Sequence, residues 1–361
     1  MQVGLIGAGN IAQIMHLPYL VEIPETEVAA IADPGTNVVE ELGDRYDIPG
    51  RYTNSDDLIA EEAESLDGVV IATPMHTHAE TAITALEADL HTFVEKPVAV
   101  TPEDAADVVA AADDTDAVCM IGYMKRYDPS YKRFAEELEN AESIDLITNT
   151  VIPPDVGSVI GEVYDNIPAD LDDEFLQASG EQRAAQLQAA IGTDDETLTR
   201  AYGYHLESIC HDVNALRGLF GEVTAIDHVD VFNGWQYLTA QLRYEGDRRC
   251  TLQSGATERK WYDERIRVDA PEGSYALEFS NAFIKNTPTE IKIKRGGTEE
   301  IEESRQTPSH EESFKLELEY FVECAEGREE VLTGPREAKR DVELIADLIR
   351  AHDGRDPVGS Y

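Results

Sequence analysis

Short apolar runs alternate with helix-like patterns along the first third of this 361-residue chain. The first run spans residues 2–6, and the second, EVAAIAD, ends at Asp33. Three further runs are GVVIATP, HTFVEKP and AVCMIGY, and the stretches HAETAITALEAD and PEDAADVVAAADD between them have the spacing of amphipathic helices. Apolar strands separated by helices are typical of parallel sheets with both faces covered. The pattern predicts a doubly wound α/β domain over residues 1–123.

The pattern changes in the second domain, which we expect over residues 124–361. A helical stretch and a strand-like stretch, SIDLITNTVI, lead into a polar, acidic segment over residues 153–200. Six strand-like runs follow, several with alternating apolar and polar residues, and two helical patterns come last. Consecutive strands of this kind are typical of an antiparallel sheet with one covered face. The 153–200 segment is expected to cover the substrate or to make oligomer contacts.

The charge of the chain is strongly negative. It contains 73 Asp and Glu residues against 29 Lys and Arg, a net charge of −44 that is spread along its whole length. Such a surface is typical of proteins from a high-salt cytoplasm, where salt screens the self-repulsion; the alternative is an ordinary acidic protein. The charge argues against nucleic acid and anionic membranes as partners, since both need a basic patch.

Cysteine usage and hydropathy predict a cytoplasmic protein. Four scattered cysteines without CxxC spacing indicate reduced thiols and no structural zinc. No signal peptide is expected, because the first predicted strand begins at Gln2, and no apolar run is long enough to span a membrane. We also expect no metal site, since no cluster of His, Asp and Glu has ligand spacing.

A glycine pattern follows the first strand. Gly7, Gly9 and Ala12 fit G-x-G-x-x-A at the start of a helical pattern. Glycines there allow a tight turn and a close backbone approach to a pyrophosphate, which a helix N-terminus attracts. Asp33 follows about 20 residues later, where an acid that binds the ribose is expected. Asp33 also begins an Asp-Pro-Gly turn, and both roles are compatible. The pattern predicts a dinucleotide site, with NAD expected over NADP because a carboxylate repels a 2′-phosphate.

Several polar residues and prolines fall at the carboxyl ends of the predicted strands, where doubly wound sheets bind their ligands. These residues are Thr73, Pro74, Glu95, Lys96, Pro97, Tyr123 and Lys125. Lys96 is therefore expected to point toward the cofactor.

The stretch YHLESICHDVNALRGLF contains a candidate acid–base pair. Its apolar residues are spaced by four, three and four positions, as on one stripe of a helix: Ile209, Val213, Leu216 and Phe220. Glu207 and His211 are four residues apart and are therefore neighbours on the helix surface, roughly opposite the stripe. From spacing alone, this pair is either an exposed Glu–His pair or part of a site.

Four motifs, taken together and in this order, resemble the Gfo/Idh/MocA oxidoreductases. They are GAGNIA from Gly7, TPMHTH from Thr73, EKP from Glu95 and GYMKRYDP from Gly122, and the last is similar to the inositol-dehydrogenase branch. The resemblance implies a Rossmann domain, a second domain with a large open sheet, and a homodimer or homotetramer. It implies cofactor contacts from Gly7, Gly9, Asn10, Ile11, Asp33, Thr73, Pro74, His78, Glu95, Lys96 and Pro97.

The resemblance also implies roles in catalysis. It implies that Lys96 contacts both the nicotinamide ribose and the reacting hydroxyl, and that the Lys96–Pro97 peptide bond is cis. The family carries an acid-x-x-x-His pair that faces the nicotinamide; its usual acid is Asp, and this chain has Glu207. Met124 and Lys125 are expected to contact the substrate, together with Lys96 and His211.

Oxidation of a secondary alcohol removes a proton from oxygen and a hydride from carbon. Histidine suits the role of base near neutral pH, a carboxylate orients it, and a lysine ammonium stabilises the developing alkoxide. We therefore predict an NAD(P)-dependent dehydrogenase of a sugar or cyclic polyol, with His211 as base, Glu207 as its orienting acid and Lys96 as electrostatic partner. Two alternatives stay open: a glycoside hydrolase that works through tightly bound NAD, and a non-catalytic NAD-binding regulator.

Overall fold

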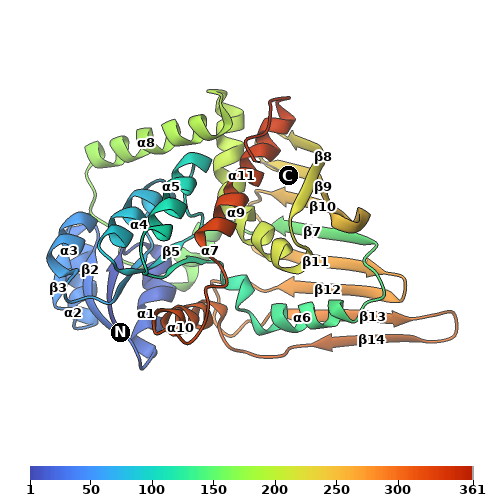
Figure 1. Cartoon of the computed structure of the whole chain (residues 1–361), viewed down its shortest axis with the longest axis horizontal. Coiled ribbons are helices and arrows are strands. Elements are labelled where there is room, and N and C mark those ends of the chain that lie inside the picture. The colour runs from blue at the N-terminus through green and yellow to red at the C-terminus, as the bar shows by residue number, and fades with distance from the viewer. Residues whose placement is uncertain (360–361) are drawn as a thin grey trace. The chain divides into compact units, whose positions relative to one another are not determined.

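The structure is a computed structural model that describes residues 1–359 and contains two compact units (Figure 1). Unit 1 consists of Met1–Tyr123, Tyr164–Ala190 and Phe314–Glu343. Unit 2 consists of the remaining segments, Met124–Val163, Ile191–Ser313 and Leu344–Tyr361. The expected domains were residues 1–123 and 124–361. The unit also changes after Tyr123, and two later segments, Tyr164–Ala190 and Phe314–Glu343, belong to unit 1.

Unit 1 is built on a six-stranded parallel sheet in the order β3-β2-β1-β4-β5-β6. Strands β1–β3 extend the sheet to one side and β4–β6 extend it to the other, so the strand order reverses between β1 and β4. The same reversal is found in doubly wound dinucleotide-binding folds. The strands are β1 (Gln2–Ile6), β2 (Glu27–Ala32), β3 (Gly50–Tyr52), β4 (Gly68–Ile71), β5 (His91–Glu95) and β6 (Cys119–Gly122). The predicted doubly wound sheet is confirmed.

Helices cover this sheet, and local signals set their ends. Asn54 accepts a hydrogen bond from the backbone N–H of Asp57 at the start of α3, and Thr101 does the same for Asp104 at the start of α5. The helices and short helical turns of unit 1 are η1 (Ala12–His16), α1 (Leu17–Glu22), α2 (Thr36–Arg45), α3 (Ser55–Glu62), η2 (Met75–Thr77), α4 (His78–Glu87), α5 (Pro102–Asp113), α8 (Asp173–Ile191) and α10 (Ser313–Ala325).

A segment near the C-terminal end of the chain covers the β6 edge of this sheet. Ile121 of β6 donates its backbone N–H to the carbonyl oxygen of Thr333 at 2.8 Å, and the Thr333 hydroxyl donates to the carbonyl oxygen of Ile121 at 2.7 Å. These bonds satisfy polar groups of a strand that would otherwise be a bare edge.

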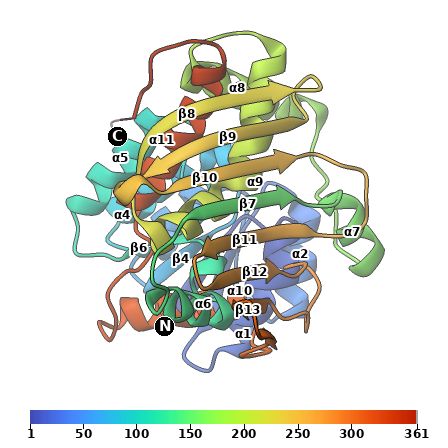
Figure 2. The ribbon, with the colours of Figure 1, turned by 90° about the vertical axis from the view of Figure 1, so that its right-hand side faces the viewer.

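Unit 2 is built on an eight-stranded sheet in the order β14-β13-β12-β11-β7-β10-β9-β8, which Figure 2 shows face on. β7 and β10 pair in parallel, and all other neighbours are antiparallel. The strands are β7 (Leu146–Ile152), β8 (Val223–Phe232), β9 (Tyr237–Tyr244), β10 (Arg249–Gly255), β11 (Asp263–Ala270), β12 (Gly273–Phe279), β13 (Glu290–Gly296) and β14 (Ile301–Gln306). The predicted large, mainly antiparallel sheet is confirmed.

One face of this sheet packs against helices α6 and α9. The opposite face carries exposed charged side chains, such as Arg265, Arg267 and Lys292. The helical elements of unit 2 are η3 (Met124–Arg126), α6 (Pro129–Glu139), α7 (Val156–Val163), α9 (Glu196–Phe220) and η4 (Glu245–Asp247); α11 (Pro335–His352) begins in unit 1 and ends in unit 2.

Helix α9 carries the candidate Glu–His pair. Its N-terminus is capped by Asp195, whose carboxylate accepts from the backbone N–H groups of Thr197 and Leu198. Gly221, at φ 82°, ends the helix in a conformation that favours glycine. The apolar stripe predicted on this helix is buried. Among the described residues, no helix is both long and apolar enough to cross a bilayer.

Candidate functional site

The glycine loop after β1 is tied directly to the acid after β2. The backbone N–H of Ala8 donates to Oδ2 of Asp33 at 2.8 Å, and the N–H of Gly35 donates to Oδ1 at 2.8 Å. Gly7 has φ 90°, and a Cβ there would lie 2.6 Å from the carbonyl carbon of Ala72. Only glycine fits this turn. The same carboxylate thus serves the turn chemistry and stands where a ribose-binding acid is expected.

The space over this loop is open. A Cβ placed at Gly9 would meet no atom of the described residues within 4 Å. The loop therefore combines a crowded turn at Gly7 with free room at Gly9. This is the arrangement that lets a bulky anion approach the backbone N–H groups at the start of a helix. Gly7, Gly9, Asn10, Ile11 and Asp33 belong to these two loops, and their cofactor contacts stay a prediction.

His78 joins two of the other strand-end loops. Its ring nitrogens lie 2.7 Å from the carbonyl oxygen of Pro97 and 2.7 Å from that of Thr73. The side chain is buried, and burial lowers the pKa of His78. His78 therefore holds the loops after β4 and β5 together, so its first role is to fix the positions of Thr73, Pro74 and Pro97.

Glu95, at the end of β5, is held on both of its oxygens. Its Oε1 lies 2.8 Å from Nε2 of His16, and its Oε2 accepts from the backbone N–H of Lys96 at 3.1 Å. Burial alone would raise the pKa of Glu95, but the hydrogen bond and charge of His16 hold it below its usual value. The Lys96–Pro97 peptide bond is cis. The Glu95 carboxylate thus fixes the backbone that carries Lys96.

A second carboxyl, which the sequence analysis did not single out, lies near Glu95. Glu317 on α10 is fully buried, and burial together with the charge of Glu95 raises the pKa of Glu317 well above its usual value. Phe314, one helical turn earlier, packs edge-on against the ring of His16 at 6.1 Å between ring centroids. The segment 314–343 therefore completes the core beneath the Glu95–Lys96 backbone.

Unit 2 contains a buried cluster of charges around Lys125. Its Nζ lies 2.5 Å from Oδ2 of Asp212 and 2.7 Å from Oε1 of Glu264, and it stands 4.3 Å from the ring centroid of Phe279. Asn149 of β7 donates its side-chain N–H to the other oxygen of Asp212 at 2.8 Å. The cluster ties η3, α9, β7 and β11 together.

The cluster holds two carboxyls but one ammonium. Burial raises the pKa of Glu264 to about 8, and the charge of Asp212 acts in the same direction against that of Lys125. The charges of Asp212 and Glu264 hold the pKa of Lys125 above its usual value, although burial alone would lower it. Lys125 is only 2% exposed. Its contact with the substrate stays a prediction, and its observed partners are these two acids.

Helix α9 presents the predicted acid–base pair away from its buried stripe. Glu207 is exposed and His211 is half-buried, while the neighbouring Asp212 is fully buried. His205 on the same helix lies with Nδ1 2.9 Å from the Ser254 hydroxyl, and burial lowers its pKa to about 4. These contacts give His205 a structural role, and they leave Glu207 and His211 as the accessible pair.

The predicted residues are thus brought together in two groups. The cofactor loops and Lys96 share unit 1, whereas Met124, Lys125, Glu207 and His211 share unit 2. Sequence reasoning missed Asp212, Glu264, Asn149, His16 and Glu317. Their signal is charge or amide polarity at positions where the strand or helix pattern points inward. Within residues 1–359, no group of three or more His, Cys, Asp or Glu could hold a metal ion, and all four cysteines are free and buried.

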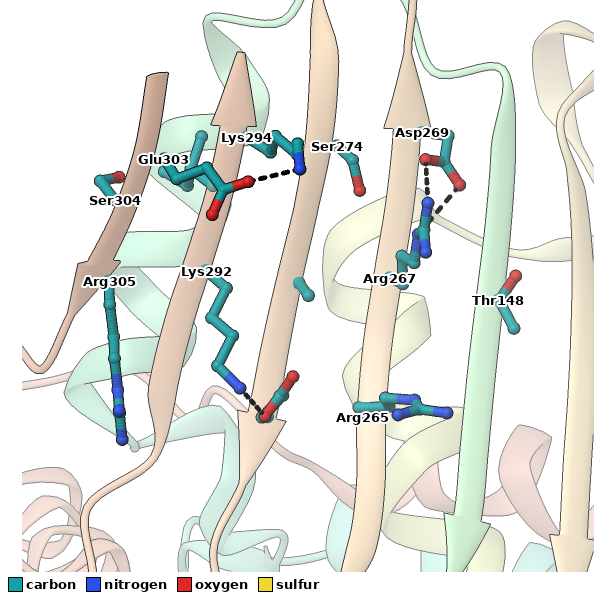
Figure 3. Close-up of a pocket in the computed structure, with 13 residues that line it drawn as sticks. Thr148, Arg265, Arg267, Asp269, Ser274, Lys292, Lys294, Glu303, Ser304 and Arg305 are labelled. Carbon is teal, nitrogen blue, oxygen red and sulfur yellow. Dashed lines mark hydrogen bonds and ion pairs between the residues drawn. The ribbon is translucent and has the colours of Figure 1, made fainter. Parts of the chain in front are cut away.

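The open face of the unit 2 sheet has a different character (Figure 3). It forms a shallow depression of about 790 Å³ over β7 and β11–β14. Arg267 pairs with Asp269 at 2.8 Å, Lys292 pairs with Glu278 at 2.5 Å, and Lys294 pairs with Glu303 (Figure 3). Because the charges are neutralised in pairs along the strands, this face does not have the convergent polar groups of a catalytic pocket.

Comparison with known proteins shows which oxidoreductases the chain is similar to. Residues 1–123 match the family model described as "Oxidoreductase family, NAD-binding Rossmann fold". The chain is 23% identical over 330 residues to scyllo-inositol 2-dehydrogenase (NAD(+)) of Bacillus subtilis, covering 89% of this chain and 84% of that protein. It is 28% identical over 283 residues to myo-inositol 2-dehydrogenase of Thermotoga maritima, covering 76% and 74%.

A solved structure extends the likeness to the whole fold. A 3-ketoreductase from Actinomadura kijaniata, solved with TDP-benzene and NADP, superimposes with a TM-score of 0.73. The match covers 98% of this chain and 97% of the other at 18% identity. At this identity, the likeness shows the fold that the two proteins share.

Proposed function

We propose that this chain, whose residues 1–123 match the NAD-binding oxidoreductase family model, is an oxidoreductase of the Gfo/Idh/MocA family that transfers a hydride between a secondary alcohol of a sugar or cyclic polyol and NAD. One observation carries the proposal: the glycine turn after β1, Asp33 after β2 and Lys96 after β5 all lie at the carboxyl edge of one doubly wound sheet. The inositol dehydrogenases among its relatives support the substrate class. The carboxylate of Asp33 supports NAD over NADP.

The residues present fit a dinucleotide. Gly7 makes the tight turn that a side chain would fill, and Gly9 leaves room for a pyrophosphate next to the backbone. Asp33, held by Ala8 and Gly35, would accept the ribose hydroxyls. When bound, nicotinamide supplies the hydride acceptor, and the protein supplies position and electric field.

We assign the proton chemistry to three side chains. His211 takes the proton from the substrate hydroxyl as the hydride leaves the same carbon, so a ketone forms and the imidazole becomes charged. Glu207, one helical turn away on the exposed side of α9, orients the ring and stabilises the imidazolium. Lys96, whose backbone Glu95 fixes, stabilises the negative charge that develops on the substrate oxygen. Met124 contacts the substrate beside them.

Lys125 then acts through α9. Its hydrogen bonds to Asp212 and Glu264 hold the helix turn that carries His211 against η3 and β11. A fully desolvated cluster of this kind is rigid when all its members are paired. We therefore propose that Lys125 positions the base and contributes at most its stem to the substrate pocket.

The test is turnover with a panel of inositols, aldoses and glycosides, with NAD and NADP, in molar KCl. Lys96→Ala and His211→Ala should each lose at least about 100-fold in kcat while still binding NAD. Binding is measured by quenching of protein fluorescence. Wild-type turnover in both variants would refute the assignment. Glycoside cleavage without net NADH would favour the hydrolase alternative, which uses the same lysine and coenzyme. Coenzyme binding without turnover of any compound would favour the regulator.

We further propose that the protein is a cytoplasmic homodimer or homotetramer that assembles through the open sheet face of unit 2. Five of its 29 basic residues line this face, namely Arg265, Arg267, Lys292, Lys294 and Arg305 (Figure 3). Elsewhere the chain is strongly acidic, so this balanced face is where a second copy meets least repulsion. Light scattering should give a dimer or larger, and the double variant Lys292→Glu, Lys294→Glu should shift it toward monomer. A wild-type monomer at micromolar concentration would refute the assembly.

A further inference from the structure

The segment between α7 and α8 crosses the cofactor loops of unit 1. Residues 164–172 have no regular secondary structure, and with α8 they belong to unit 1 rather than to the unit they follow in sequence. In Figure 1 the light-green chain runs from the start of α8 down to the blue elements of unit 1. We call residues 164–172 the strap.

The first fixed point of the strap lies beside the glycine loop. Gln13 donates its side-chain amide to the carbonyl oxygen of Ile167 at 3.0 Å and accepts from the N–H of Ile167 at 2.9 Å. The side-chain amide of Asn166 donates to Oδ1 of Asn10 at 2.8 Å. A reciprocal pair of bonds to one amide group fixes the strap backbone in one register at this point.

The second fixed point lies beside the acid that follows β2. Asn37 donates its side-chain N–H to the carbonyl oxygen of Pro168 at 2.9 Å. Its backbone N–H lies 3.3 Å from a carboxylate oxygen of Asp170, and its Oδ1 accepts from the N–H of Asp170 at 3.0 Å. Ala169 packs on Gly35 so closely that a Cβ at Gly35 would lie 2.6 Å from the Cβ of Ala169. The strap therefore packs against the chain between β2 and the start of α2, which carries Asp33.

Helix α8 supplies a third anchor, after β4. The Ser179 hydroxyl lies 3.0 Å from Nε2 of His76, and the Gln186 side chain donates to the carbonyl oxygen of His76 at 3.0 Å. Residues 164–190 thus bind the loops after β1, β2 and β4. These three loops form the carboxyl edge on which a dinucleotide lies.

The strap spans the glycine loop without filling it. Its contacts with that loop go to the side chains of Asn10 and Gln13, and the space at Gly9 stays open to 4 Å. Its backbone packs most tightly at Gly35, and Asn37 holds Pro168 by a hydrogen bond. This pattern fits a cover under which a ligand lies, and it does not fit a plug that occupies the loop itself.

We propose that the strap forms the outer wall of the coenzyme site and closes over the adenosine half of bound NAD, so that the coenzyme is released slowly. Asp170 brings a second carboxylate to the loop that follows Asp33, and this charge adds to the discrimination against a 2′-phosphate. The proposal rests on the proposed function, because it requires that the site binds a nicotinamide coenzyme. It assigns Asn166 and Asp170 to coenzyme binding and gives part of the acidic 153–200 segment a role.

The test measures coenzyme exchange in the intact protein. Stopped-flow fluorescence follows release of NADH when excess NAD is added, for the wild type, Asn166→Ala, Asp170→Asn and a loosened strap with Pro168→Gly and Ala169→Gly. Asp165→Asn is the matched control, because it removes a charge from an exposed position of the same segment. Circular dichroism confirms that each variant is folded.

We expect the loosened strap to release NADH at least about tenfold faster than the wild type, a change of 1.4 kcal/mol in barrier height. Asn166→Ala should give a smaller increase, and Asp165→Asn should stay within twofold. Asp170→Asn should improve NADPH affinity relative to NADH by about threefold to tenfold, the size of one partly screened charge interaction.

Three outcomes overturn the proposal, and they can be told apart. Equal release rates in the wild type and the loosened strap would show that the segment is not part of the coenzyme site. If the coenzyme binds only to the loosened variant, the strap blocks the coenzyme site in the wild type instead of covering a bound coenzyme. If neither the wild type nor any variant binds NADH or NADPH, the proposed function itself fails.

Discussion

Glu264 should make the stability of unit 2 fall as the pH rises, and its replacement should remove that dependence. In the folded protein its pKa is about 8, against a usual value of 4.5 in the unfolded chain. Between these values the folded state binds one proton more than the unfolded state. The contribution of this group is therefore fully present below pH 4.5 and is lost as the pH rises through 8.

The magnitude follows from the same two values. At 1.36 kcal/mol per pKa unit, the wild type loses about 2–3 kcal/mol of unfolding free energy between pH 5.5 and pH 7.5 that Glu264→Gln does not lose. The glutamine is neutral throughout, keeps the shape of the acid and can still contact Lys125 through its carbonyl oxygen.

Urea unfolding in molar KCl at several pH values measures this difference for the wild type and Glu264→Gln. Glu302→Gln, at an exposed position of β14, is the control and should run parallel to the wild type. A free-energy difference between wild type and Glu264→Gln that stays constant to within about 0.5 kcal/mol over this range would refute the reasoning. That result would mean that Lys125 keeps Glu264 ionised at neutral pH despite burial and the charge of Asp212.

Two further predictions concern unit 1. Gly7→Ala should cost about 2–4 kcal/mol of unfolding free energy and abolish coenzyme binding, because its Cβ would clash with Ala72. Gly9→Ala should unfold like the wild type, because its Cβ would meet no neighbouring atom. Equal thermal midpoints for the two variants would contradict the turn geometry. Glu317→Gln and Glu317→Leu should leave stability at pH 8 within about 1 kcal/mol of the wild type or raise it, since burial and the charge of Glu95 make an ionised carboxyl unfavourable at this position. A loss of more than about 3 kcal/mol in urea unfolding for both would show that the carboxyl makes a strong interaction.

The sheet of unit 1 could be predicted because its signals are local. Each strand is a short apolar run, each helix has its own spacing and cap, and the order of alternation leaves few topologies. The return of residues 164–190 and 314–343 to unit 1 could not be predicted in this way. Several of the hydrogen bonds that hold the strap use backbone groups of Ile167 and Pro168, which have no side-chain signature.

The residues of the candidate site also fall into those with a local sequence signal and those without one. Gly7, Asp33 and Lys96 stand in motifs whose chemistry is local to a turn or a strand end. The charge cluster of unit 2 depends on register instead. Glu264 stands in DERIRVDA at an inward position, and only the pairing of β11 with β7 brings it to Lys125. A charged residue at an inward position of an alternating strand is a usable signal, but it does not identify the partner.

Coenzyme retention bears on which reaction the site performs. A dehydrogenase that makes net NADH must exchange its coenzyme once per turnover, so its kcat cannot exceed the release rate that the strap permits. Glycoside cleavage through transient oxidation and readdition returns the coenzyme to its oxidised form, and slow release then has no effect on the rate. The ratio of kcat to the NADH release rate is therefore decisive for any substrate found. A ratio above one requires a redox-neutral cycle, and a ratio near one, rising in step with release when the strap is loosened, identifies net oxidation limited by product departure.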